Sequence, residues 1–507
     1  MLNNLVYIFA FLPILSALFI LVIGRNKVFI QAVCFSALAL MLFIAVMISI
    51  ACFDLPQIES DLSFDIISIP VEFRVDLTLC GFLIFLIAIK AVQLALFQKT
   101  AADRLSLQQF QLYFASHLIS CFAIIGIVIS NNIFNIFLFT EIYFISYFAL
   151  SMTFQDKKIN YQNSRQVIVN FASSALFLVT LVVLYFNFET LNLSDLMLKI
   201  EAKSLHALGL MEVICSLVII ALIVKFIPFW VFFSKNIKDS ISLSNELFFV
   251  LFINLNLLIC LLIKMSYIIF AINLVTSIIV FSCLAVITYS SITVIISKHF
   301  RPQITLFCLS IFCFSVLCLA IKSQSSIKAL FFYILTYNIC ALIIFAFTSF
   351  IWMRYNVSTI EEVSILKNSK RFFDRGVHRI FLIIVILSLP LPYSPIFYAN
   401  LFLFDAILDN NQNQLYEFSN LFDPYIVIAI LLFYMSSIML FFKMVSALIS
   451  DKENSCNRKS KNGYLDNIAA FYFIFLIVAI ILFYIIIGIG NFNSVIGKIL
   501  ENIFNLL

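Results

Sequence analysis

Residues Asn132 to Met152 read NIFNIFLFTEIYFISYFALSM, and this segment sets the class of the whole chain. It is apolar along nearly its entire length, and about twenty such residues suffice for a helix to cross the bilayer core. One carboxylate, Glu141, lies near the middle. A charge at that depth costs about 3 kcal/mol or more, and such groups usually face a partner or an ion path. Glu141 therefore predicts a counter-charge on another helix and a proton or ion site; the alternative is a structural polar contact between helices.

The composition extends this interpretation to the whole chain. Of its 507 residues, 64% are hydrophobic and 11% are charged, and the mean hydropathy is +1.12, whereas soluble proteins carry about 25% charged residues. We therefore predict an all-α polytopic membrane protein. The twelve Cys form no CxxC pair and the four His are dispersed, so we expect no metal site and no cofactor in this chain.

The sequence contains about fourteen apolar segments of spanning length. Their bounds are roughly 4–24, 28–53, 75–97, 111–130, 132–153, 166–188, 207–233, 247–270, 272–297, 303–322, 327–352, 379–404, 424–448 and 465–490. They suggest four parts: helices 1–3 in residues 1–110, a first repeat of helices 4–8 in 111–271, a second repeat of helices 9–13 in 272–449, and a loop with helix 14 in 450–507.

The loop charges predict the orientation. Lys and Arg concentrate in the loops after odd-numbered segments, most densely between residues 354 and 379, while residues 54–72 and 405–423, after even-numbered segments, are acidic. Because short basic loops stay in the cytoplasm, both termini should lie on the non-cytoplasmic side. We expect the membrane to be the bacterial cell (inner) membrane.

Four lysines inside apolar segments are candidates for the counter-charge of Glu141: Lys90, Lys225, Lys264 and Lys443. Lys225 lies deep in the seventh segment, three residues before Pro228. A proline breaks the helical hydrogen bonding, and freed carbonyls at membrane depth require water or protein around them. Glu141 and Lys225 are therefore the predicted pair.

The twelfth segment is interrupted in the same way, by Pro390, Pro392 and Pro395. Two broken segments, helices 7 and 12, lie five helices apart, which predicts two inverted five-helix repeats. Transporters build midplane sites from this arrangement. The second copy has no charge at its break, and Asn400 is the nearest polar residue.

Two stretches resemble the D-type membrane protein of the Mrp-type Na+/H+ antiporters and the antiporter-like subunits of respiratory complex I. Residues Phe134 to Glu141, FNIFLFTE, are similar to the run FN-x-(Y/F)-V-F-F-E of the Mrp D-type protein. Residues Asn163 to Leu196 resemble the run SxxYxxxNxxSSxLFxxGxxxLY…GTLN of the same protein. The resemblance implies that Glu141 and Lys225 form the pair that gates proton movement.

The resemblance is weaker in the rest of the predicted path. Lys264 lies about two turns beyond the place of the family's helix-8 lysine, which is nearer Asn256. In helix 11, Tyr337 and Ala341 replace a histidine and a lysine, and in helix 12 Asn400 replaces a lysine or glutamate. The second half therefore looks degenerate, because asparagine and tyrosine do not alternate between charge states near neutral pH.

Three functions remain open from the sequence. The first is a membrane subunit of a multisubunit cation/proton antiporter, exchanging protons for Na+ next to other Mrp-like subunits. The second is a proton-pumping membrane subunit of NADH:quinone oxidoreductase. The third is a non-transporting structural subunit of such a complex. No redox or hydrolytic site is recognisable in this chain, so any enzymatic activity would belong to the surrounding complex.

Overall fold

The structure is a computed structural model. It describes residues 2–54, 57–62, 71–153, 157–202, 208–227, 243–266, 273–296, 300–321, 323–334, 395–413, 425–436, 438–439 and 442. Seven helices within these ranges are long and apolar enough to cross a membrane. The predicted multi-pass helical architecture is therefore confirmed. The total of fourteen spans extends outside the described residues and stays a prediction.

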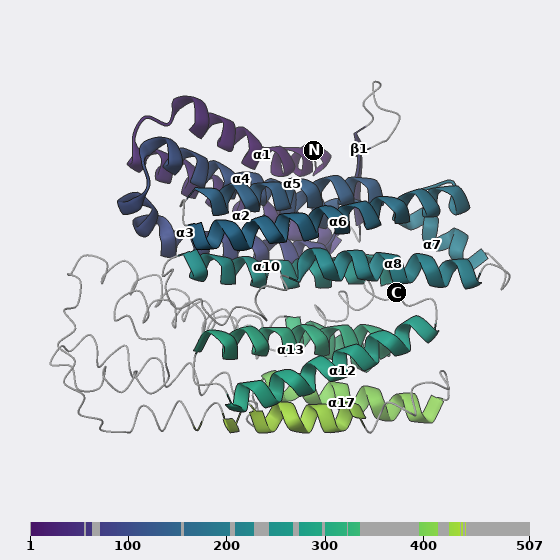
Figure 1. Cartoon of the computed structure of the whole chain (residues 1–507). Helices are drawn as coiled ribbons and strands as arrows, with labels where there is room; N and C mark the ends of the chain where they lie inside the picture. The colour runs from purple at the N-terminus through teal and green to yellow at the C-terminus, as the bar shows by residue number, and fades with distance from the viewer. Residues whose placement is uncertain are drawn as a thin grey trace, which may run out of the picture. The chain divides into compact units, whose positions relative to one another are not determined.

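The chain divides into two compact units, one up to Val275 and one that begins at Thr276 (Figure 1). The helices and strands of the first unit are α1 (Leu2–Ile23), α2 (Lys27–Asp54), β1 (Gln57–Leu62), β2 (Val71–Asp76), α3 (Leu77–Arg104), α4 (Leu107–Ile129), α5 (Ile133–Met152), α6 (Lys157–Phe188), α7 (Leu193–Ala202), α8 (Leu208–Phe226) and α10 (Leu243–Lys264). Those of the second unit are most of α12 (Asn273–Ile296), then α13 (Phe300–Ile321), α14 (Gln324–Phe332), α17 (Pro395–Asn413) and a helical stretch at Tyr425–Ser436. These two units are not the predicted five-helix repeats, whose bounds of 111–271 and 272–449 stay predictions.

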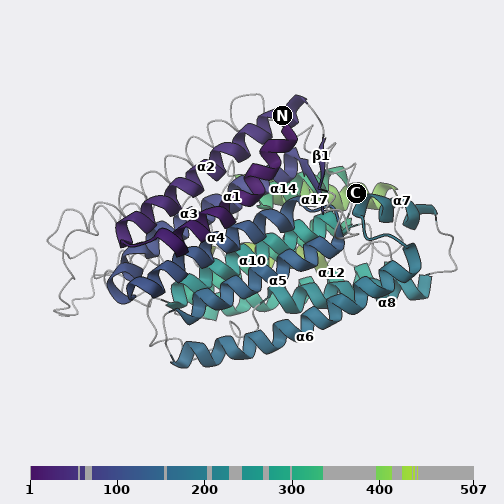
Figure 2. The ribbon, with the colours of Figure 1, turned by 90° about the horizontal axis from the view of Figure 1, so that it is seen from above.

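Among the seven helices long and apolar enough to span a membrane, α4 is the most enclosed. In an apolar stretch of 18 residues of α4, 83% is buried, against 33% in the corresponding stretches of α1 and α6. It packs against α1, α3 and α5, and Figure 2 shows α6 along one edge of this unit, beside α5 and α8. The outer helices instead expose large apolar side chains such as Val22 and Phe171, as suits a surface that faces hydrocarbon.

Capping side chains determine where α4 and α5 begin. Ser106 and Gln109 form a reciprocal capping box at the start of α4, which satisfies two otherwise unpaired backbone N–H groups. The side chain of Asn132 accepts a hydrogen bond from the backbone N–H of Phe134 at the start of α5. The boundary predicted between segments 111–130 and 132–153 is thus a two-helix junction with its own cap.

A polar clamp holds this junction against two other segments. The backbone N–H of Asn131 donates to the carbonyl oxygen of Glu72 on β2 at 3.0 Å. The amide side chain of Asn131 donates to Asn192 at 3.0 Å, and Asn192 in turn bonds the carboxylate of Glu72. These contacts fix the end of α4 and the start of α5 relative to the turn between α6 and α7, and so set the register of α5 against α6.

The structure adds elements that hydropathy did not predict. Residues 54–72, predicted as an acidic loop, contain β1 and the start of β2, which pair antiparallel with Glu59 opposite Arg74. Strand β2 continues to Asp76, past the predicted start of the third segment at residue 75. Helix α6 begins at Lys157 and α17 continues to Asn413, both beyond the predicted apolar limits. Helical hydrogen bonds are local and continue into polar sequence outside the hydrocarbon core, whereas a hydropathy window stops at the first charged residues.

One turn shows why a glycine suits the family motif. Glu189, which follows α6, has a φ of 53° and occupies the position of the glycine in the family's GTLN run. Its backbone N–H donates to the carbonyl oxygen of Tyr185 at 2.8 Å, a common left-handed helix end. Lys199 donates to the carbonyl oxygen of Phe188 at 2.6 Å and helps to cap the same helix end.

Candidate functional site: an ion pair shared by three helices

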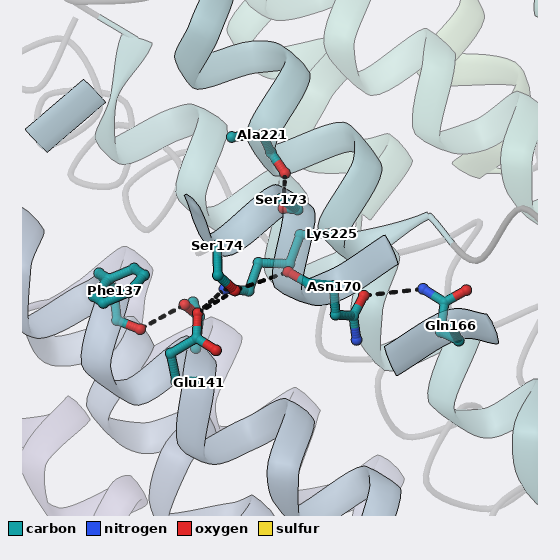
Figure 3. A network of polar contacts seen from close by, with 9 residues as sticks. Phe137, Glu141, Gln166, Asn170, Ser173, Ser174, Ala221 and Lys225 are labelled. Carbon is teal, nitrogen blue, oxygen red and sulfur yellow. Dashed lines mark hydrogen bonds and ion pairs between the residues drawn. The ribbon is translucent and has the colours of Figure 1, made fainter. Parts of the chain in front are cut away.

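The site lies where α5, α6 and α8 meet. Helix α6 packs against both α5 and α8, and the hydroxyl of Ser173 on α6 donates to the carbonyl oxygen of Ala221 on α8 at 2.7 Å. Ala221 is one turn before Lys225, so this bond sets the height of Lys225 relative to α6. Figure 3 shows Glu141, Ser174 and Lys225 converging from the three helices.

The predicted pair is in direct contact. The Nζ of Lys225 forms an ion pair and hydrogen bond with Oε1 of Glu141. Ser174 joins both partners, because its hydroxyl lies 2.7 Å from Oε1 of Glu141 and 3.1 Å from the Nζ of Lys225. A serine hydroxyl can accept from the ammonium while it donates to the carboxylate. The three side chains therefore form one closed hydrogen-bonded unit.

The two charges differ in exposure. The side chain of Lys225 is 0% exposed, whereas that of Glu141 is 26% exposed. Lys225 is also in the last turn of α8, where the partial negative charge of a helix C-terminus favours a cation. The carboxylate is thus the member of the pair that can be reached from outside the chain.

Aromatic rings on α5 enclose the ammonium. The Nζ of Lys225 lies 5.3 Å from the ring centroid of Phe137 and 5.7 Å from that of Phe144. Both distances are within the range of cation–π attraction. Phe137 and Phe144 are four residues before and three residues after Glu141, so all three occupy one face of α5.

A polar stripe leads away from the pair along α6. Gln166, Asn170 and Ser174 are spaced four residues apart and so share a face. The amide of Gln166 donates to the side chain of Asn170 at 3.0 Å, and the hydroxyl of Ser174 lies 2.8 Å from the backbone oxygen of Asn170 (Figure 3). This stripe gives α6 a hydrogen-bonded line from the pair toward its polar N-terminal part.

The polar residues of α10 make different contacts from the pair. Asn254 accepts a hydrogen bond from the hydroxyl of Tyr143 on α5 at 2.6 Å, and both groups are buried. Asn256, which was expected on the ion path, donates to the carbonyl oxygen of Phe252 in its own helix at 2.9 Å. The side chain of Asn254 therefore links α10 to α5.

Lys264 lies at the end of α4. Its Nζ donates to the carbonyl oxygens of Ser130 at 2.8 Å and Ile127 at 3.4 Å, and the residue is 9% exposed. Lys27 caps α3 in a similar way, through the carbonyl oxygens of Ala102 and Leu105. A lysine at a helix C-terminus satisfies unpaired carbonyl groups. Lys225 differs from both of these lysines because its amine contacts a carboxylate.

The second unit carries a neutral polar cluster. The hydroxyl of Tyr333 donates to Oδ1 of Asn400 at 2.5 Å, and the amide of Asn400 donates to the hydroxyl of Tyr434 at 3.0 Å. Asn400 and Tyr333 are 1% and 0% exposed. We call these three residues the Tyr–Asn–Tyr cluster.

Several predicted positions fall at or beyond the edges of the described residues. Pro395 is the first residue of α17, where a proline is well tolerated because its missing N–H needs no helical partner. Helix α8 ends at Phe226. Pro228, Tyr337, Pro390 and Pro392 lie outside the described residues, so their expected roles stay predictions.

Comparison with known proteins identifies the family. Residues 130–422 match the family model described as NADH:quinone oxidoreductase/Mrp antiporter, TM. The chain belongs to this family. The matched range includes the pair and the Asn400 region, and it confirms the predicted membership of the complex I and Mrp antiporter family.

Two solved structures share the fold. The archaeal membrane-bound sulfane sulfur reductase, a respiratory membrane complex, contains a chain that matches with a TM-score of 0.72 at 16% identity, over 98% of this chain and 97% of that chain. The Mrp complex from Dietzia sp. DQ12-45-1b contains one that matches with a TM-score of 0.69 at 17% identity, over 88% of this chain and 79% of that chain. At these identities the similarity shows the fold alone.

Sequence reasoning did not assign Ser174, Asn254 or Tyr143 to the site. Ser174 belonged to a recognised motif but had no role, although its spacing of four from Asn170 was visible in the sequence. Asn254 and Tyr143 had no such signal, because only the packing of α10 in the fold brings their side chains together.

Proposed function

We propose that this chain is the proton-translocating membrane subunit of a multisubunit cation/proton antiporter, similar to the Mrp D-type protein, in which Glu141 and Lys225 form the gating pair. The observation that carries the proposal is the contact of the Lys225 ammonium with the Glu141 carboxylate and with Ser174. An ionisable pair inside membrane-spanning helices is expensive to bury, and such groups usually serve ion or proton movement.

The mechanism is electrostatic. At a separation of about 4 Å and an effective dielectric constant of about 20, two unit charges attract by about 4 kcal/mol. Protonation of Glu141 removes that attraction, which corresponds to about a thousandfold change in an equilibrium constant. The carboxylate is the accessible partner, at 26% exposure, so the proton arrives at Glu141 and the ammonium of Lys225 is released.

Ser174 is the next hydrogen-bonding group beside Glu141, and the polar stripe on α6 lines the route beyond it. The hydroxyl of Ser174 can turn from Glu141 to the backbone oxygen of Asn170, since these two oxygens lie 2.7 Å and 2.8 Å from it. Rotation of the Ser174 hydroxyl redirects its O–H from one oxygen to the other, and no helix has to move. Gln166 and Asn170 then continue the hydrogen-bonded line toward the N-terminus of α6.

The proposal includes location and partners. We place the chain in a bacterial cell (inner) membrane, and the loop charges favour both termini on its non-cytoplasmic side. The solved structures with this fold are chains of multisubunit membrane complexes, which supports other membrane subunits as neighbours. Na+ is the cation suggested by the resemblance to the Mrp D-type protein.

Two alternatives have specific support. The family description includes NADH:quinone oxidoreductase, so the same pair could serve a pump driven by a redox arm; copurification with flavin and iron–sulfur subunits instead of small Mrp-like subunits would identify that case. A non-transporting subunit is favoured by the neutral Tyr–Asn–Tyr cluster in the second unit.

The test is transport by variants of the pair in the complete complex. Glu141→Gln and Lys225→Ala should each lower proton-coupled antiport in membrane vesicles by about a hundredfold or more, because neither leaves a pair that can open on protonation. Glu189→Gln, at an exposed carboxylate, and Lys99→Ala serve as matched controls and should keep wild-type rates. Wild-type transport in both pair variants would leave the non-transporting subunit as the function.

A further inference from the structure

A second group of buried polar side chains lies between α3 and α4, outside residues 130–422 that the family model matches. Lys90 and Gln93 belong to α3 and His117 to α4, and their exposures are 3%, 0% and 0%. The dispersed histidines gave no hint of a site in the sequence. The fold packs the helix that carries His117 against a helix with two buried polar residues.

The faces of the two helices are directed at each other. His117 and Cys121 are four residues apart on α4 and so share a face, and both interact electrostatically with Lys90. Gln93 is three residues after Lys90 and lies on the same face of α3. The ring of Tyr113 meets that of His117 edge-on, with 4.7 Å between centroids.

Four polar atoms of this group have no protein partner. Both ring nitrogens of His117 and both amide atoms of Gln93 are buried without a hydrogen bond in the part of the chain that the structure describes. The nearby hydroxyls of Ser116 and Ser120 are directed to backbone oxygens of their own helix, at 2.8 Å and 2.7 Å. Buried polar groups in native proteins are nearly always bonded to protein or to ordered water, and buried water typically makes about three such bonds.

We propose that ordered water occupies a site between α3 and α4 lined by Lys90, Gln93 and His117, and that the His117 imidazole exchanges protons with this water. The bare ring nitrogen accepts from a water molecule and the other nitrogen donates to one. The imidazole can take a proton from hydronium to give imidazolium and water, and the reverse step returns it.

Other titratable groups connect this site with the surrounding helices. Cys121 interacts electrostatically with Cys34 on α2 and with Tyr143 on α5. The hydroxyl of Tyr143 continues to Asn254 on α10. On α10, Lys264 bonds the end of α4 instead of the site. Tyr143 is thus the link from this group to the helix that carries Glu141, but the water site does not require the gating pair to function.

The experiment measures deuterium exchange at the C2 carbon of the imidazole, using mass spectrometry on the full chain in its native complex. The chain has only four histidines, His117, His206, His299 and His378, so the peptide with His117 is unambiguous. We expect His117 to exchange within about tenfold of its rate in the unfolded chain, since water reaches the ring. A slower rate means a dry ring and overturns the proposal.

Substitution of a lining residue distinguishes exchange with water bound at this site from exchange that follows general opening of the helices. Gln93→Leu removes two of the polar atoms and should slow exchange at His117 by about fivefold or more, because water then loses partners. Ser116→Ala, a neighbouring buried change whose hydroxyl faces its own helix, should leave the rate unchanged. Gln93→Met replaces Gln93→Leu if the latter fails to assemble. An unchanged rate in the folded Gln93 variant overturns the proposal, whatever the transport activity of the complex.

Discussion

The two units hold their buried polar groups in different ways. In the first, a carboxylate, an ammonium and a hydroxyl meet on α5, α6 and α8. In the second, the Tyr–Asn–Tyr cluster joins α17 with two other helical segments through neutral groups. Both clusters are hydrogen bonded, yet of the two only the first contains groups that form an ion pair. Membrane helices therefore tolerate polar clusters of either kind, and the ionisable one costs more to keep.

The cost explains why a charged cluster indicates function more strongly than a neutral one. A satisfied neutral cluster contributes about 1 kcal/mol for each hydrogen bond, which is reason enough to keep it for stability. A buried ion pair is often no better than an apolar replacement. Maintenance of the fold alone would not require Glu141 and Lys225 to face each other, whereas a proton-coupled step would.

The largest expected difference between the clusters is in stability. Glu141→Gln leaves the ammonium of Lys225 buried without its carboxylate, and breaking a buried pair costs about 3–5 kcal/mol. Lys225→Met should cost less, because the remaining carboxylate is 26% exposed. The double variant should recover part of the loss. Denaturant unfolding in detergent micelles measures these free energies, and additive losses in the double variant would show that the two side chains do not interact.

A smaller effect is expected at the neutral cluster. Asn400→Leu leaves the hydroxyls of Tyr333 and Tyr434 without the Asn400 amide and should lower the free energy of unfolding by about 2–4 kcal/mol. Antiport in vesicles should stay within about tenfold of wild type, because no group of the cluster changes charge near neutral pH. The matched control is Ser436→Ala, whose hydroxyl donates to the backbone oxygen of Phe433 in its own helix. Loss of transport equal to that of Glu141→Gln would give the second unit an essential proton step.

The smallest effect is expected from the hydroxyl that bridges the pair. Ser174→Ala removes one bond to each charge and should cost about 1–2 kcal/mol in stability, with transport lowered by about tenfold because the carboxylate loses its link to the α6 stripe. Thr180→Ala is the control, since Thr180 is buried on the same helix and its hydroxyl bonds the carbonyl oxygen of Leu176. Equal transport in the two variants would remove Ser174 from the path.

Much of the first unit was predictable because its signals are local. An apolar run with one carboxylate predicts both a span and a partner, and the capping residues at Ser106 and Asn132 start helices where the pattern changes. The hairpin of β1 and β2 was missed because many of its residues are charged or polar, and hydropathy treats such a stretch as a loop. Strand β2 is also bonded to the α4–α5 junction through Asn131 and Glu72, a contact between segments far apart in the sequence.

The sequence alone determined the membrane class, the family and the identity of the two charges, because burying charge among apolar residues is costly wherever the chain goes. Only the tertiary structure decided that Ser174 joins the pair, that Tyr143 reaches Asn254, and that Lys264 caps the end of α4. Those contacts depend on the rotation and height of one helix against another. Packing sets both, and the order of residues along a single helix does not encode them.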